Sequence, residues 1–201
     1  MDLLPSFDLI EHGREERNLE YKETLNWEDS STKGKIAKSA MAMANIPDGG
    51  AIVIGVEENS EVFDPVGMKP EDYESFGQDD TQDWVNGYAD PFVQLTVQRE
   101  EAADGKKFVV IQIQQFEALP VVCTKSGVEG LRSGAVYTRS RRKYQTVEVS
   151  SQTEMRGILD RATDKQILEL RRRGILLSSA ESLPETVAGH SEKFDKQLSG
   201  L

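Results

Sequence analysis

The chain has 201 residues, of which 37% are hydrophobic and 29% charged, and its formal net charge at pH 7 is −11. This length and composition fit one domain with a short appendage, and no apolar run approaches the roughly 20 residues of a membrane-spanning helix. Cys123 is the only cysteine, so an intrachain disulfide is excluded and we expect a reducing, cytoplasmic setting. The negative charge argues against nonspecific binding of nucleic acid.

The first strand is predicted over residues 18–24, where side chains alternate between two faces. Leu19 and Tyr21 share one face, and Glu20 and Lys22 share the other. A carboxylate beside an ammonium on one face is a small polar site, in which the acid could hold a cation and the lysine could meet phosphoryl oxygens.

A helix and a buried strand are predicted next. Ser31 and Thr32 can cap a helix that ends at Asn45. The run at 51–56 is wholly apolar and does not alternate, so we expect a central strand buried on both faces. Two glutamates, the second of them Glu58, follow this strand, and we expect them to lie at its mouth.

The remaining elements are predicted from turn and capping signals. We expect a hairpin return at 62–68, an acidic helical region at 70–88, strands at 93–98, 108–114 and 135–139, a helix capped by Ser151 and Glu154, and a second helix capped by Thr163 and Gln166.

Charge is unevenly distributed along the chain. The segment from Lys125 to Lys143 is basic, with Glu129 its only acid, whereas residues 57–90 are strongly acidic around a single Lys69. A basic strip on an acidic body is compatible with a directed polyanion site. It is equally compatible with a dimer whose basic and acidic faces meet.

Three segments together resemble the Schlafen/AlbA-like domain family. They are an acidic signature over 15–22, a helix, Gly-Gly turn and strand over 42–58, and a Tyr-x-Arg element over 137–139. The resemblance covers roughly residues 11–162. It implies an α+β fold with a mixed, mostly antiparallel sheet and packed helices.

The resemblance defines the central domain, and the residues on either side of it complete the division of the chain. We expect a leader at 1–14, a Schlafen/AlbA-like domain at 15–162 and a C-terminal helical extension at 163–201. Apolar residues after Gly174 favour helices that support self-association.

Schlafen-type ribonucleases use three acidic residues, two from the first signature and one from the strand-end pair. Matched motif to motif, these positions are Glu15, Glu20 and Glu58, and Lys22 lies beside them. Three converging carboxylates would hold Mg²⁺ or Mn²⁺ and activate a water for phosphodiester cleavage. The alternative for each acid is a solvated surface charge.

The basic strip supplies the candidate nucleic-acid ligands. Arginine forks match phosphate oxygens, and a tyrosine could stack on a base. The candidates are Arg132, Tyr137, Arg139, Arg141, Arg142 and Lys143. The alternative is a solvated hairpin edge whose charges discourage strand pairing.

The predicted function is nucleic-acid binding, RNA ahead of DNA, and if the protein is an enzyme, metal-dependent endoribonuclease activity on structured RNA such as tRNA. One alternative is a noncatalytic DNA-binding regulator that works as a dimer. Another is an interaction subunit of a larger assembly, such as one in phage defence, whose acidic face docks a partner protein. We expect a homodimer or higher oligomer and no membrane association. No nucleotide cofactor is expected, because a phosphate-binding Gly-rich loop is missing.

Overall fold

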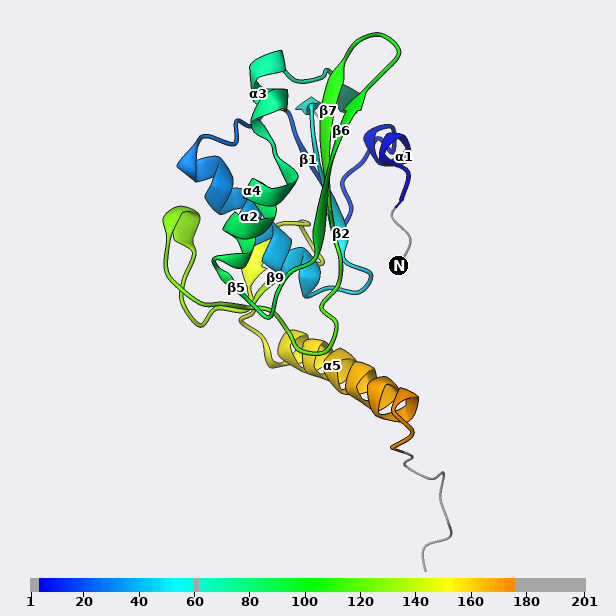
Figure 1. Cartoon of the computed structure of the whole chain (residues 1–201), viewed down its shortest axis with the longest axis vertical. Coiled ribbons are helices and arrows are strands. Elements are labelled where there is room, and N and C mark those ends of the chain that lie inside the picture. The colour runs from blue at the N-terminus through cyan, green and yellow to red at the C-terminus, as the bar shows by residue number, and fades with distance from the viewer. Residues whose placement is uncertain (1–3, 60–61, 176–201) are drawn as a thin grey trace, which may run out of the picture. The chain divides into compact units, whose positions relative to one another are not determined.

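A computed structural model describes residues 4–59 and 62–175 of the chain. It has an α+β fold with a mixed, mostly antiparallel sheet, as predicted (Figure 1). Two compact units are distinguished, Met1–Thr163 and Asp164–Leu201. The helices predicted after residue 175 lie outside the described residues. No described helix is both long and apolar enough to cross a membrane.

The elements follow one another in the chain as helices and short strands. The helices are α1 (Ser6–Ile10), α2 (Ser30–Ala44), α3 (Pro70–Ser75), α4 (Gln78–Asn86) and α5 (Gln152–Arg172), with a 3₁₀ turn, η1, at Val128–Gly130. The strands are β1 (Leu19–Lys22), β2 (Gly50–Ile54), β3 (Val56–Asn59), β4 (Val62–Pro65), β5 (Ala89–Asp90), β6 (Leu95–Glu101), β7 (Lys107–Ile113), β8 (Val122–Cys123), β9 (Tyr137–Arg139) and β10 (Thr146–Glu148).

The central sheet has the strand order β1-β2-β7-β6. Strand β1 runs parallel to β2, and the β2–β7 and β7–β6 pairs are antiparallel. The remaining strands form two-stranded ribbons, β3–β4, β5–β8 and β9–β10. Since β1 has a neighbour on one side only, its other edge is open to the segments that build the site below.

Helices cover both faces of the sheet (Figure 1). Leu19 and Tyr21 of β1 pack with Leu9 and Ile10 of α1 in one hydrophobic cluster. The opposite face contributes to the larger core, which includes much of α2. Glu20 is therefore on the α2 side of β1, as the period of two predicts.

The segment after α2 holds the end of this helix against neighbouring strands. Asn45 is fully buried, and its side-chain amide donates to the carbonyl oxygens of Val121 and Tyr137 at 2.8 and 3.0 Å while its Oδ1 accepts the Val121 N–H at 2.8 Å. Gly49 has φ +70°, and a Cβ there would lie 2.1 Å from the carbonyl oxygen of Ile113. The Asn and Gly-Gly positions of this sequence segment thus fix the end of α2 against the strands.

The predicted central strand is broken at Gly55. Its φ is +110°, a Cβ there would lie 2.7 Å from Cδ1 of Phe108, and its N–H donates to the Lys22 carbonyl oxygen at 2.8 Å. The chain leaves the sheet at this point and forms the separate β3–β4 hairpin. Glu57 and Glu58, expected at the mouth of the central strand, belong to the separate strand β3, which begins two residues after β2 ends.

Three helix starts were predicted from capping residues, and one of them is confirmed. Helix α2 begins after Asp29, earlier than the predicted Ser-Thr cap. The Ser151 hydroxyl accepts the N–H of Glu154 at 3.1 Å, which confirms the cap of α5. The second cap is wrong, because α5 is continuous and the Thr163 hydroxyl donates to the Leu159 carbonyl oxygen at 3.0 Å.

The Asp164–Leu201 unit is described through residue 175 as the second half of α5. Arg171 and Arg172 occupy its last turn, and Arg173 Nε lies 2.8 Å from Glu169 Oε1. Gly174 follows with φ +71°. Cations in a last turn before such a glycine complement the helix dipole, which accounts for the arginine run.

Candidate nucleic-acid interface

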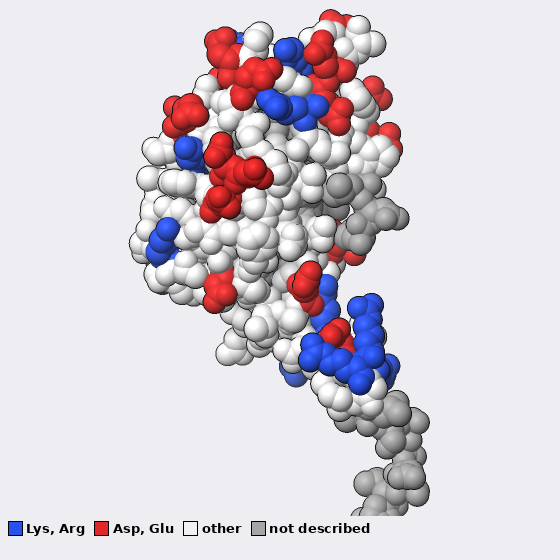
Figure 2. Space-filling view, viewed as in Figure 1, with Lys and Arg blue, Asp and Glu red and all other residues white. Residues whose placement is uncertain are grey.

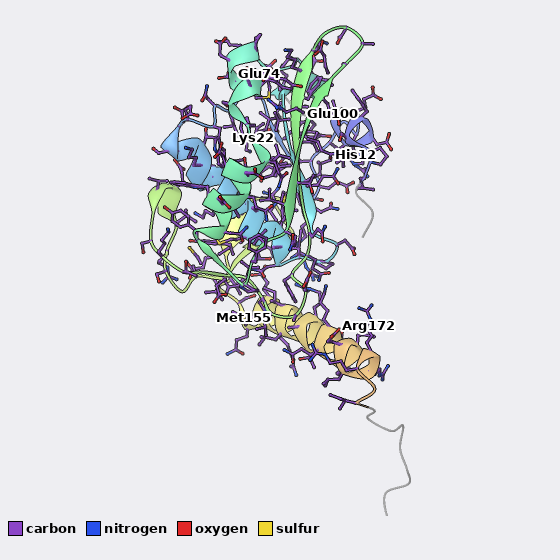
Figure 3. The ribbon with its side chains drawn as sticks, viewed as in Figure 1. His12, Lys22, Glu74, Glu100, Met155 and Arg172 are labelled. Carbon is purple, nitrogen blue, oxygen red and sulfur yellow. The ribbon has the colours of Figure 1, made fainter. Side chains whose placement is uncertain are left out.

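Glu20 is the buried acid of the site, with 8% of its surface exposed. Its Oε1 lies 2.8 Å from Lys22 Nζ and its Oε2 lies 2.8 Å from Arg139 Nη1. Figure 3 shows Lys22 on the side of the sheet away from His12 and α1. A buried carboxylate is costly unless paired, so these two cations are what make its position tenable.

Arg139 joins strand β9 to the segment before β1. Its Nε donates to the Arg17 carbonyl oxygen at 3.2 Å, and Arg17 Nε donates to the Arg139 carbonyl oxygen at 2.9 Å. The side chain is 1% exposed, and its Nη2 is buried with no partner among the described residues. The prediction that Arg139 contacts phosphate is wrong for this structure, because its guanidinium is enclosed and bound to Glu20.

Tyr137 is also enclosed, with 2% of its surface exposed. Its hydroxyl donates to the Gly130 carbonyl oxygen at 3.1 Å and accepts the Arg132 N–H at 2.8 Å, and burial raises its pKa. Lys38 Nζ lies 5.3 Å from the ring centroid. Stacking of Tyr137 on a base, as predicted, is therefore excluded in this arrangement. The Arg132 side chain, in turn, is ion-paired with Glu148.

The three predicted metal ligands do not converge. Glu15 Oε1 accepts the N–H of Tyr21 at 3.1 Å, at the open edge of β1. Glu58 is exposed on β3, while both oxygens of Glu20 are held by cations. Within residues 4–59 and 62–175, no three His, Cys, Asp or Glu side chains are grouped so as to hold a metal ion. The residues as arranged do not fit Mg²⁺ or Mn²⁺.

Three arginines from distant parts of the chain influence one another electrostatically, and one of them, Arg17, is hydrogen-bonded to the carbonyl oxygen of Arg139 in β9. Burial lowers the pKa of Arg17 and of Arg161, and the positive charge of Arg141 lowers both further. The charge of Arg161 also lowers the pKa of Arg17, whereas Glu154 acts in the opposite direction. Arg161 Nη2 donates to the Asn45 carbonyl oxygen at 2.6 Å, which fixes it at the end of α2. We call Arg17, Arg141 and Arg161 the arginine cluster.

The turn between β9 and β10 extends this basic surface. Arg141, Arg142 and Lys143 are all exposed there, as the sequence predicts. Sequence reasoning missed Arg17 and Arg161, because neither lies near the basic strip in the chain. Positions 17, 141 and 161 are far apart in the sequence, and no sequence pattern links them. Only the fold brings them together.

Acidic side chains gather elsewhere on the domain. Figure 2 shows them over α3 and α4, and both helices carry acids in their first turn. Charge is thus segregated, with the arginine cluster near β9 and an acidic region over these two helices.

The Schlafen AlbA_2 family model matches residues 15–148, which is more than half of the chain. The chain belongs to the Schlafen AlbA_2 family. Membership associates it with nucleic-acid-related function. No curated protein matches the chain.

Two solved structures resemble this Schlafen AlbA_2 chain. One is a protein from Corynebacterium diphtheriae, 17% identical over 66% of this chain and 22% of its own, with a TM-score of 0.45. The other is the N-terminal domain of a protein from Nitrosomonas europaea described as related to the ATP-dependent DNA helicase RecG, 21% identical over 75% of this chain and 97% of its own, with a TM-score of 0.46. The chain spans about a fifth of the Corynebacterium protein, since 22% of that protein is covered.

The Schlafen AlbA_2 signature segments meet in space. Glu20 of the first segment is bonded to Arg139 of the third, and Asn45 of the second is bonded to the carbonyl oxygen of Tyr137 in the third. These signature residues are buried, so in this chain they build the frame of the site.

Proposed function

We propose that this Schlafen AlbA_2 domain binds nucleic acid, RNA ahead of DNA, through the arginine cluster and the turn between β9 and β10. One observation carries the proposal: Arg17 Nε donates to the carbonyl oxygen of Arg139, at the start of the turn that exposes Arg141, Arg142 and Lys143. The positive charge of Arg141 also lowers the pKa of Arg17 and of Arg161. In the described part of the chain, none of the three has a carboxylate within 4.0 Å. Like charges held together are unfavourable unless an anion joins them, and phosphates of a nucleic acid supply that anion.

The net charge of −11 favours binding of nucleic acid at one defined basic surface over diffuse, nonspecific binding. Acidic regions repel a polyanion, so phosphates are guided to the basic surface near β9. RNA is placed ahead of DNA on the family resemblance, which favours structured RNA such as tRNA.

The test is a salt-dependent affinity for tRNA and for a matched DNA hairpin. The variant Arg141→Gln is informative because Arg141 is exposed on the turn between β9 and β10. Loss of one phosphate contact is expected to lower the slope of log affinity against log salt by about one. The triple variant with Arg142→Gln and Lys143→Gln is expected to lower it by about two to three. Arg99→Gln, an exposed position on β6, is the control.

The outcomes separate the alternatives. A slope that changes in the triple variant and not in Arg99→Gln supports binding at this surface. Equal slopes for the triple variant and the wild type would overturn the proposed surface. Absence of any salt-dependent affinity would favour a docking subunit with a protein partner.

Metal-dependent cleavage stays a prediction from the resemblance. Running the same substrates with Mg²⁺, Mn²⁺ or EDTA decides it, because an endoribonuclease that uses Glu15, Glu20, Glu58 and Lys22 needs the metal. Binding that persists in EDTA without cleavage favours a noncatalytic regulator. The predicted homodimer or higher oligomer is decided separately by light scattering.

A further inference from the structure

A concave site lies at the first turn of α2. The other end of this helix carries Asn45, whose carbonyl oxygen accepts from Arg161. Its volume is about 550 Å³. We call it the tryptophan pocket. It is lined by Trp27, Glu28, Lys33, Asp80, Asp83, Trp84, Gly87, Tyr88 and Lys125.

Aromatic rings in this pocket already hold the protein's own ammonium groups. Lys33 Nζ lies 5.6 Å from the Trp27 ring centroid and 5.3 Å from that of Trp84. Lys125 Nζ lies 4.5 Å from the ring centroid of Tyr88. Cations within about 6 Å of a ring centroid are attracted by the ring quadrupole, most strongly for tryptophan. The pocket therefore has the chemistry of an ammonium site, and Lys33 is its resident cation.

Carboxylates at the pocket carry negative charge that the two lysines do not pair. Glu28, Asp80 and Asp83 line the pocket and are exposed. Of the residues that the structure describes, no ion pair within 4.0 Å joins these carboxylates to Lys33 or Lys125. Three acids against two ammonium groups leave the pocket net negative, which disfavours a phosphate and favours a cation.

The wall of the pocket also contains a buried hydrogen-bond donor. The indole N–H of Trp84 is buried and has no hydrogen-bond partner among the described residues. A buried donor without an acceptor is unfavourable, and native proteins rarely leave one unexplained. A ligand that carries a hydrogen-bond acceptor beside its ammonium group could satisfy this N–H.

We propose that the tryptophan pocket binds an alkylammonium cation, which takes the place of Lys33 between the two indoles. The ammonium group would face the rings of Trp27 and Trp84, with Asp80 and Asp83 at the rim. The cation can come from a lysine side chain of a partner protein or from a free polyamine. This site does not depend on nucleic-acid binding at the arginine cluster.

Tryptophan fluorescence tests the proposal directly, because the chain has two tryptophans and both line the pocket. Tetramethylammonium is titrated against sodium chloride at matched ionic strength. The wild type is expected to show a saturable change. Lys33→Met keeps most of the side-chain volume and removes the competing charge, so it is expected to bind about tenfold more tightly.

Surface variants guard against a folding artefact. Asp80→Asn with Asp83→Asn alters exposed side chains on α4 and is expected to weaken binding several-fold, while the neighbouring Asp79→Asn, outside the pocket lining, is the control. Circular dichroism verifies that each variant is folded. A response equal to that of sodium chloride in both the wild type and Lys33→Met would overturn the proposal. So would a loss of affinity in Asp79→Asn that matches the double variant.

The source of the cation is decided by two further titrations. Spermidine represents the free polyamines, and N-acetyl-lysine amide represents a protein side chain. Saturation by one of these at concentrations where the other has no effect assigns the source. If neither saturates while tetramethylammonium does, the site is specific for a quaternary ammonium.

Discussion

The contact between Glu20 and Arg139 predicts a large loss of stability in Glu20→Gln. Arg139 is 1% exposed, and Glu20 is its carboxylate partner at 2.8 Å. Removing one partner of a buried ion pair typically costs about 3–5 kcal/mol, because the remaining charge is left uncompensated. Glutamine keeps the shape and one acceptor, so we expect about 3 kcal/mol. Small domains are stable by roughly 5–15 kcal/mol, and the loss is a large share of that.

Urea denaturation followed by circular dichroism measures the effect. The midpoint is expected to fall while the slope stays constant, which identifies a change in stability alone. Glu23→Gln, at an exposed position just after β1, is the control and is expected to stay within about 0.5 kcal/mol of the wild type. Replacing both Glu20 and Arg139 by methionine is expected to recover much of the loss, since no buried charge is left unpaired.

One result would refute the reasoning. If Glu20→Gln has the same urea midpoint as Glu23→Gln, Glu20 is not a cross-link of the fold. If that stable variant also loses a metal-dependent cleavage that the wild type has, Glu20 acts as the metal ligand that the sequence predicts.

Three further predictions concern the frame of the site. Asn45→Ala removes three hydrogen bonds and leaves the buried Val121 N–H without its acceptor, so urea denaturation is expected to show a loss of about 2–4 kcal/mol. Burial raises the pKa of Tyr21 to about 12. The unfolded chain, with a tyrosine pKa near 10, loses this proton first, so stability is full below about pH 10 and falls by about 2 kcal/mol as the pH rises to 12. Tyr21→Phe should lack this part of the pH dependence, and identical profiles for both proteins would contradict the assignment. Gly55→Ala places a Cβ 2.7 Å from Phe108 at a φ of +110°, so calorimetry should show a melting temperature lower by several degrees.

Local patterns predicted the elements that depend on neighbouring residues. The alternation of Leu19 and Tyr21 with Glu20 and Lys22 placed β1 correctly, because a period of two leaves one way to bury its apolar side. The Ser151 cap was predicted for the same reason, since its partner is three residues away. Local signals fail where tertiary contacts decide.

Gly55 and Thr163 show how those failures arise. An apolar run with one glycine looks like a single strand, and only the approach of Phe108 explains why the chain turns there. A Thr-x-x-Gln motif looks like a cap, yet the Thr163 hydroxyl can equally bond back within a helix. Because the chain turns at Gly55, Glu58 belongs to the β3–β4 hairpin and not to the central strand. The arginine cluster was beyond prediction, because its members share no segment.

The link between Glu20 and Arg139 spans 119 residues, which gives it a consequence during protein synthesis. At roughly 5–20 residues per second, the ribosome delivers Arg139 about 6–24 s after Glu20. Over that interval the Glu20 carboxylate at the edge of the nascent sheet lacks the buried positive charge of Arg139. Burying Glu20 in this state would cost free energy, because the carboxylate would lose its contact with water without gaining this partner. The domain is therefore expected to complete its fold after β9 has emerged, and a chain that stalls earlier stays open to chaperones and proteases.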